Sequence, residues 1–167
     1  IQDNLNKIVS VLKENKNVLE IILMGSFSKG EACMTKKGKV LSDYDFWVIT
    51  ALPVLFLKKS QTDWEKILGK NYSFVELNYI QKSKRLTNST TEYIDIKKYG
   101  KVLYGSGNLF KKILKDVSEV IKKDEGLNIF IHKFPHIFKA REIQKENEVS
   151  AVYELCKVIV ACGDLII

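Results

Sequence analysis

Residues typical of fibrous, disulfide-stapled or disordered proteins are scarce in this chain of 167 residues. It has two prolines, nine glycines and three cysteines, whereas hydrophobic residues make up 46% of it. This composition excludes collagen-like, low-complexity and disulfide-scaffold proteins, and it suits a globular chain of about one domain. Because three cysteines without regular spacing form no disulfide framework, we expect a cytoplasmic protein.

Arginine is almost missing, although the chain is basic overall. The 27 basic and 20 acidic residues give a net charge of +7, and among the basic residues only Arg85 and Arg141 are arginines. Bidentate contacts to bases and phosphates are mainly arginine chemistry, so the lysine excess favours diffuse attraction over a dedicated nucleic-acid groove. An RNA-binding protein that uses the lysine-rich stretches stays an alternative hypothesis.

Long uninterrupted apolar runs are also missing. The longest apolar stretch, about 151–167, contains Glu154, Lys157 and Asp164, which a transmembrane helix seldom tolerates together, so we expect no membrane contact. The stretch is apolar on more than one helical face, which predicts a homodimer through the C-terminal helix or a missing helical partner. The chain begins at Ile1 rather than Met, which indicates a fragment or a chain without its terminal segments.

Hydrophobic spacing divides the chain into helices and strands. Apolar residues three and four apart mark helices, and short β-branched or aromatic runs mark strands. The pattern predicts a helix at 2–17, strands at 18–24 and 43–50, a helix at 60–68, a strand at 72–80 and helices from 108 onward. Only the stretch 93–104 is ambiguous between helix and strand.

This order of elements predicts an α+β fold. We expect a small mixed β-sheet flanked by helices, followed by a C-terminal helical segment. The first domain is placed at residues 1–106 and the helical segment at 107–167, where a longer helical domain could begin.

Two polar motifs interrupt the apolar strands. In the first, G-S-F-S-K-G, a turn at Gly25 and Ser26 before a helix offers unpaired N–H groups and a hydroxyl to phosphates. The second, S-D-Y-D-F, places Asp43 and Asp45 two apart on a strand, so both carboxylates leave one face and can share divalent cations. Mg²⁺ suits such oxygen ligands, with Mn²⁺ as a substitute. Each motif alone is commonly a turn or a strand edge, but together they indicate a triphosphate site.

These residues resemble the DNA polymerase beta-like nucleotidyltransferase superfamily, which is marked by Gly-Ser, a downstream Gly and Asp-x-Asp. Gly25, Ser26, Gly30, Asp43 and Asp45 stand at those places. The resemblance implies the nucleotidyltransferase fold and Mg²⁺-dependent transfer of a nucleoside monophosphate from ATP or another nucleoside triphosphate, with release of pyrophosphate. The acceptor is unidentified; a small molecule is favoured, while RNA and protein stay open.

The resemblance extends over about 18–105 and departs from the family pattern at one place. Minimal members have a shorter turn between the two motifs, whereas residues 34–40 look like an inserted loop or hairpin tip. The insertion leaves the Asp-x-Asp motif intact, and we expect it to lie where it can touch the acceptor.

The superfamily usually supplies a third carboxylate from a neighbouring strand, and this chain offers two candidates. Glu76 lies in F-V-E-L-N-Y-I, a clear strand pattern, whereas Asp95 lies in the ambiguous stretch, so we favour Glu76. The resemblance then implies two Mg²⁺ ions held by Asp43, Asp45 and Glu76, which are also the predicted catalytic residues.

The resemblance also implies a nucleotide-binding set made of Gly25, Ser26, Lys29 and Gly30. In that set Lys29 would neutralise charge on the leaving pyrophosphate. A different class of function is a catalytically silent domain of the same fold that serves as a binding or assembly module. Two like charges kept together in Asp-x-Asp argue against silence, because carboxylates side by side repel one another.

Overall fold

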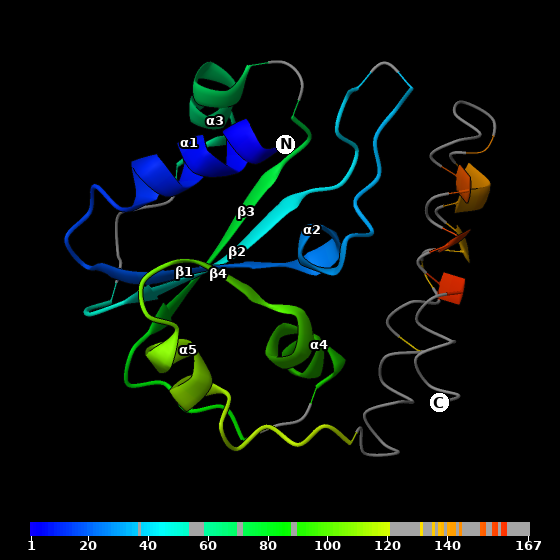
Figure 1. Ribbon diagram of the computed structural model, residues 1–167. Helices are drawn as coiled ribbons and strands as arrows, with labels where there is room; N and C mark the ends of the chain where they lie inside the picture. The colour runs from blue at the N-terminus through cyan, green and yellow to red at the C-terminus, as the bar shows by residue number, and fades with distance from the viewer. Residues whose placement is uncertain are drawn as a thin grey trace. The chain divides into compact units, whose positions relative to one another are not determined.

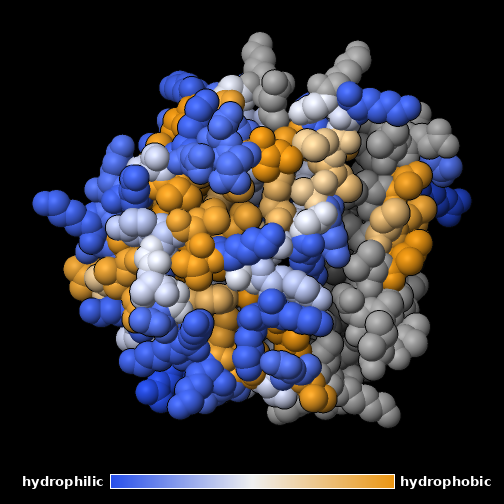
Figure 2. Space-filling view, in the orientation of Figure 1, coloured by the Kyte–Doolittle hydropathy of each residue, from blue (hydrophilic) through white to orange (hydrophobic). Residues whose placement is uncertain are grey.

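The computed structural model describes most of the chain in two compact units, residues 1–118 and 119–167. The described residues are 1–36, 38–53, 59–69, 72–87, 90–120, 131, 135, 137, 138, 140–142, 144, 151, 152, 155, 156, 158 and 159. Hydrophilic residues cover much of the visible surface of the first unit, with smaller hydrophobic areas between them (Figure 2).

The first unit is built on a four-stranded mixed sheet with the order β3-β2-β1-β4 (Figure 1). Its strands are β1 (Val18–Met24), β2 (Tyr44–Thr50), β3 (Val75–Gln81) and β4 (Lys101–Tyr104). β1 pairs antiparallel with both β2 and β4, whereas β2 and β3 are parallel. The prediction of a small mixed sheet in an α+β fold is therefore confirmed.

The described helices of this unit are α1 (Gln2–Leu12), α2 (Gly25–Lys29), α3 (Gln61–Leu68), α4 (Thr91–Tyr99) and α5 (Asn108–Ile113). α3 begins with a capping box, in which the Ser60 hydroxyl accepts from the Asp63 N–H at 3.3 Å and the Asp63 carboxylate accepts from the Ser60 N–H at 3.1 Å. The helix at 60–68 is thus confirmed, with Ser60 as its N-cap.

The first predicted helix is shorter than expected. It ends at Leu12 instead of Asn17, because Asn15 turns the chain into β1: its side-chain oxygen accepts from the Asn17 N–H at 2.9 Å, and its carbonyl accepts from the Val18 N–H at 2.9 Å. Short-range bonds of this kind compete with the helix ladder.

The ambiguous stretch holds two elements, α4 and then β4. They meet at Gly100, where a Cβ would lie 2.5 Å from the carbonyl oxygen of Ile96, so only glycine fits this close approach. A change from helix to strand within so few residues explains why neither period dominates the sequence pattern.

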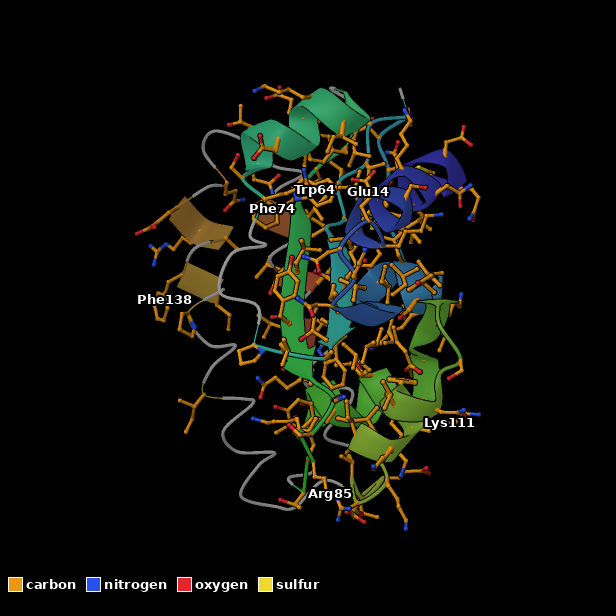
Figure 3. The ribbon with its side chains drawn as sticks, turned by 90° about the vertical axis from the view of Figure 1, so that its left-hand side faces the viewer. Glu14, Trp64, Phe74, Arg85, Lys111 and Phe138 are labelled. Carbon is orange, nitrogen blue, oxygen red and sulfur yellow. The ribbon has the colours of Figure 1, made fainter. Side chains whose placement is uncertain are left out.

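Helices cover both faces of the sheet (Figure 1). α1 and α3 pack on one face through a core that includes Ile8, Phe46 and Trp64, and Figure 3 shows Trp64 on the side of α3 that faces the sheet. α4 and α5 contribute to a second core on the other face, which includes Trp47 and Ile96. β1 and β2 are therefore buried on both sides, as their nearly continuous apolar runs indicate.

The first unit extends to Ser118, past the domain end placed at 106, because α5 is fastened to β1. The carboxylate of Glu20, 2% exposed, accepts hydrogen bonds from the N–H groups of Leu109 at 3.2 Å and Phe110 at 2.9 Å, and from the Ser106 hydroxyl at 3.2 Å. It thereby satisfies backbone donors of the first turn of α5.

Described residues of the second unit are mostly helical. Within the described part of the chain, no helix is both long enough and apolar enough to cross a membrane. Most of the stretch 151–167, on which the predicted homodimer depends, lies outside the described residues.

Candidate active site

A cavity of about 420 Å³ opens among α2, α4 and the first halves of β2 and β3. The two sequence motifs meet there. Met24, the last residue of β1, pairs with Asp45 of β2, so the antiparallel pairing brings the Gly-Ser turn beside the second aspartate of Asp-x-Asp. Tyr44 and Phe46 point to the opposite face and are fully buried, which confirms the expected alternation along this strand.

Gly25 makes this approach sterically feasible. Its φ is +65°, and a Cβ at this position would lie only 2.1 Å from Oδ2 of Asp45. Any other residue would push the carboxylate out of its place and strain the backbone. Gly25 was predicted to bind nucleotide. The structure gives a more direct reason for glycine at this position, because only glycine leaves room for the predicted metal ligand Asp45.

Asp45 and Glu76 are exact partners in the parallel register of β2 and β3. Partners in register project from the same face of a sheet, so their carboxylates converge on the cavity wall, which both residues line. Burial is the first cause that raises the pKa of Asp45, to about 7, and the negative charges of Glu76, Asp43 and Glu92 raise it further.

Asp43 and Glu76 are both exposed to solvent, and the carboxylate of each accepts a hydrogen bond from another side chain. Asp43 is exposed, does not belong to the cavity wall, and accepts a hydrogen bond from the Ser73 hydroxyl at 3.0 Å. Glu76 is also exposed, because β3 is an edge strand, and it accepts from the Asn78 amide at 3.2 Å. Because Glu76 lies on an edge strand and is exposed, its charge does not need a partner in the folded chain. The observation that connects Glu76 with the site is its register with Asp45.

Ser26 and Gly30 occupy different parts of α2. Ser26 lines the cavity, and its hydroxyl makes no hydrogen bond to the described residues. Gly30 lies outside the cavity wall and ends α2 with a φ of +83°, its N–H donating to the Ser26 carbonyl. The structure thus places Ser26 where a phosphate could reach it and gives Gly30 a position at the helix end.

Lys29 and Asp95 form an ion pair between α2 and α4, and both line the cavity. The Lys29 ammonium also lies 5.5 Å from the centre of the Tyr99 ring. Sequence reasoning treated Asp95 as the rival third carboxylate. Its engagement with Lys29, together with the register of Glu76 and Asp45, favours Glu76.

Comparison with known proteins agrees with this geometry. Residues 6–106 match the sequence profile of the family Polymerase beta, Nucleotidyltransferase. The chain belongs to this family. The resemblance predicted from the Gly-Ser and Asp-x-Asp motifs is thereby confirmed. No curated protein matches the chain.

Three of the solved structures that are similar to the chain are described as toxin–antitoxin proteins. One is described as a toxin–antitoxin with AMP-PNP, at 18% identity and a TM-score of 0.44, covering 84% of this chain and 92% of the other. Another is the toxin–antitoxin MntA-HepT, at 17% identity and a TM-score of 0.42, covering 87% and 94%. A Y104A mutant described as MntA-HpeT has 22% identity and a TM-score of 0.41, covering 84% and 91%.

Sequence reasoning missed Glu92, a further carboxylate in the cavity of this nucleotidyltransferase-family chain. It lies in the first turn of α4, and partial burial followed by the charge of Glu76 raises its pKa. The Thr90 side chain caps this helix by accepting from the Tyr93 N–H at 3.2 Å. A capping threonine followed by the apolar residues Tyr93, Ile94 and Ile96 is a helix-start signal. It could have predicted that Glu92 lies in the first turn of a helix.

The donor set of the family site fits Mg²⁺. No three His, Cys, Asp or Glu side chains within the described ranges form a metal cage by themselves. Mg²⁺ seldom uses such a cage, because it takes one or two protein carboxylates and completes its shell with water and substrate phosphates. Asp45 and Glu76 supply such a pair. Except for Lys29, the charged residues of the wall are all acidic, and divalent cations would offset that charge for an incoming triphosphate.

Proposed function

We propose that the chain catalyses Mg²⁺-dependent nucleotidyl transfer from a nucleoside triphosphate to an acceptor. In this reaction the acceptor atom bonds to the α-phosphorus and loses its proton, while the bond from that phosphorus to the bridging oxygen breaks and pyrophosphate leaves. Family membership supports the reaction class. The observation that carries the proposal is the in-register pair of Asp45 and Glu76, facing the Gly25–Ser26 turn across one cavity.

Phosphate binding is assigned to α2. The free hydroxyl of Ser26 can donate to a phosphate oxygen, and Gly25 leaves room for the carboxylate of Asp45 beside it. Lys29, held by Asp95 at the wall, is positioned to balance charge on the departing pyrophosphate.

Metal binding is assigned to the carboxylates. Asp45 and Glu76 would hold Mg²⁺ from the cavity side, and Asp43 would add an oxygen from its exposed position just before β2. Two ions are expected, and Mn²⁺ could replace them. When bound, such ions orient the triphosphate and lower the pKa of an attacking hydroxyl. The hydrogen bond from Ser73 orients the carboxylate of Asp43 for this task.

The substrates and location are also proposals. We propose ATP or another nucleoside triphosphate as donor, and a small molecule, RNA or protein as acceptor. Because one related structure is described with AMP-PNP and as a toxin–antitoxin, ATP and protein acceptors belong in the first assay. The thiols of Cys33 and Cys156 are free, which supports a reducing compartment such as the cytoplasm.

The test is a transfer assay with the purified chain, Mg²⁺ and each α-labelled nucleoside triphosphate against a panel of acceptors. Pyrophosphate and labelled product are expected for the wild-type chain, and neither is expected for Asp45→Asn or after chelation of the metal. Triphosphate binding without pyrophosphate release across the whole panel would contradict the proposal and identify a catalytically silent binding module.

A further inference from the structure

β3 forms one edge of the four-stranded sheet, and its two faces differ in chemistry (Figure 1). The face that packs against the core shared with α1 and α3 is apolar: Val75, Leu77 and Tyr79. On the other face Glu76 and Asn78 line the cavity, and the next residue of that face, Ile80, packs against the second core. Asparagine is depleted in strands, so strand formation does not explain Asn78 in the middle of β3.

A hydrogen bond joins the two polar residues of this face. Nδ2 of Asn78 donates to Oε1 of Glu76 at 3.2 Å, and among the described residues no other group donates to Glu76. Because a carboxylate only accepts, the amide turns its NH₂ group toward Glu76, and Oε2 stays available to a cation. Glu76 is exposed and needs no partner for its charge, so the consequence of this bond is the direction of its side chain.

Like charges around the cavity make that direction matter. After burial, the negative charge of Glu76 is the next cause that raises the pKa of Asp45 and of Glu92. This repulsion favours a Glu76 side chain that turns away from the other carboxylates and out into solvent. A glutamate on an edge strand has several rotatable bonds and few neighbours that restrain them. The bond from Asn78 opposes the outward turn.

Asn78 itself lies beside a fixed aromatic pair. It is the in-register partner of Trp47 on β2, and partners in register project from the same face of a sheet. Trp47 is 2% exposed and meets the ring of Tyr93 from α4 edge-on, with 5.9 Å between the ring centres. A close-packed neighbour of this kind limits the rotamers that the Asn78 amide can adopt.

We infer that Asn78 is a positioning residue that directs the carboxylate of Glu76 toward the Mg²⁺ ion of the active site. The inference rests on the proposed function, which assigns Glu76 to the metal. Asn78 acts through Glu76 and takes no part in the chemistry itself. Side chains that hydrogen-bond a metal-ligating carboxylate in this way typically contribute about tenfold to a hundredfold to metal affinity.

Direct contact between Asn78 and the nucleotide is the alternative, because the amide also lines the cavity. The two roles predict different results. A positioning residue affects the metal, and it does so only while Glu76 is present. A nucleotide contact weakens the binding of the triphosphate whether Glu76 is present or not.

The test is a Mn²⁺ titration of the whole chain in the presence of a saturating non-hydrolysable ATP analogue, with free Mn²⁺ measured by electron paramagnetic resonance. Asn78→Leu removes the donor at similar size, and Asn78→Ala removes it without added bulk. In both we expect the affinity for the more weakly bound Mn²⁺ to fall by about tenfold, while calorimetry gives an analogue affinity within about twofold of wild type. Asn78→Gln keeps an amide donor and should retain most of the Mn²⁺ affinity.

The matched control is Gln81→Leu, which removes an amide from the same edge strand. Gln81 is an odd number of residues from Asn78, so it belongs to the face of β3 that points away from the cavity. Its loss should change Mn²⁺ affinity by less than about twofold. Thermal melts of all variants, followed by circular dichroism, report whether each one is folded.

A double-mutant cycle then tests the dependence on Glu76. Glu76→Gln alone should weaken the same Mn²⁺ ion, and adding Asn78→Leu to it should change the affinity by less than about twofold, because the group that Asn78 positions has lost its charge. In the transfer assay, raising the Mg²⁺ concentration should restore the rate of Asn78→Leu, with little change in KM for the triphosphate.

Three results would overturn the role of Asn78: unchanged Mn²⁺ affinity in Asn78→Leu and Asn78→Ala, an equal loss in Gln81→Leu, or a full further loss when Asn78→Leu is added to Glu76→Gln. Unchanged Mn²⁺ affinity in Glu76→Gln itself would contradict the metal assignment of Glu76 and the inference with it. Mn²⁺ binding that depends on both residues, without pyrophosphate release on any acceptor, would contradict the proposed reaction and leave the role of Asn78 standing.

Discussion

Two carboxylates on neighbouring strands have opposite environments. Glu20 on β1 is almost fully buried, and three donors from the start of α5 surround it. Asp45 on β2 is partly buried, receives no hydrogen bond from the described residues, and faces Glu76 and Glu92. Glu20 thus joins β1 to α5, whereas Asp45 has no hydrogen-bond partner among the described residues.

The difference separates structure from function in one sheet. A buried carboxylate with backbone donors stabilises the fold, because its charge is compensated within the molecule. A carboxylate among other carboxylates lowers stability in the absence of a ligand, since both burial and repulsion oppose its ionised form. Such a cost is typical of functional sites, where an external cation or substrate supplies the compensation.

The largest expected effect comes from neutralising the carboxylates of the Asp-x-Asp motif. Asp43→Asn and Asp45→Asn should each lower nucleotidyl transfer by about a thousandfold, because each neutralises a carboxylate that we propose as a Mg²⁺ ligand. Circular dichroism should show that both variants remain folded. Turnover comparable to wild type in either variant would remove that residue from the metal site.

The next effect distinguishes the two candidates for the third carboxylate. Glu76→Gln should leave triphosphate binding nearly intact and slow the chemical step by about a hundredfold, because nucleophile activation is lost. Asp95→Asn should do much less to that step, since Asp95 pairs with Lys29. Single-turnover rates measure both, and the reverse ranking would place Asp95 at the metal.

The structural carboxylate should respond in the opposite way. Glu20→Ala leaves buried N–H groups of Leu109 and Phe110 without an acceptor, and we expect the free energy of unfolding to fall by about 2–3 kcal/mol. Urea denaturation measures this loss. The control is Glu14→Ala, an exposed residue after α1 (Figure 3), which should change stability by less than about 0.5 kcal/mol.

A smaller effect is expected at the phosphate-facing hydroxyl. Ser26→Ala should weaken the binding of a non-hydrolysable ATP analogue with Mg²⁺ by about 1–3 kcal/mol, the range for a charge-assisted hydrogen bond. Calorimetry on this variant and on the exposed control Ser10→Ala measures the difference. Unchanged affinity in both would mean that the Gly-Ser turn has no role in binding.

The smallest effect is a pH dependence of stability in the metal-free protein. Because the folded-state pKa of Asp45 is about 7 and its usual value is 3.8, the folded chain binds this proton more tightly, and stability falls as pH rises from about 4 to 7. Asp45→Asn should remove that fall, raising the melting temperature by a few degrees at pH 8 and by little at pH 4. An equal rise at both pH values would contradict the electrostatic explanation.

The sequence by itself determined β1, β2 and the two motifs between them. Val18–Met24 and Tyr44–Thr50 are apolar runs whose strand character depends on their own side chains, and the G-S and D-x-D motifs mark where each strand meets the cavity. Family membership and the mixed sheet followed from these local patterns, because burial on both faces leaves little freedom in such segments.

Only the tertiary structure decided which charged groups meet. The contacts from Glu20 to Phe110, and from Lys29 to Asp95, join residues 90 and 66 positions apart. The facing of Asp45 and Glu76 depends on the register of two parallel strands. Local periodicity reports which side of an element is buried, but it holds no information on which distant element covers that side. For this reason the sequence pattern could name Asp45 and Glu76 as candidates, while folding assigned Glu20 to the scaffold and brought Glu92 into the cavity.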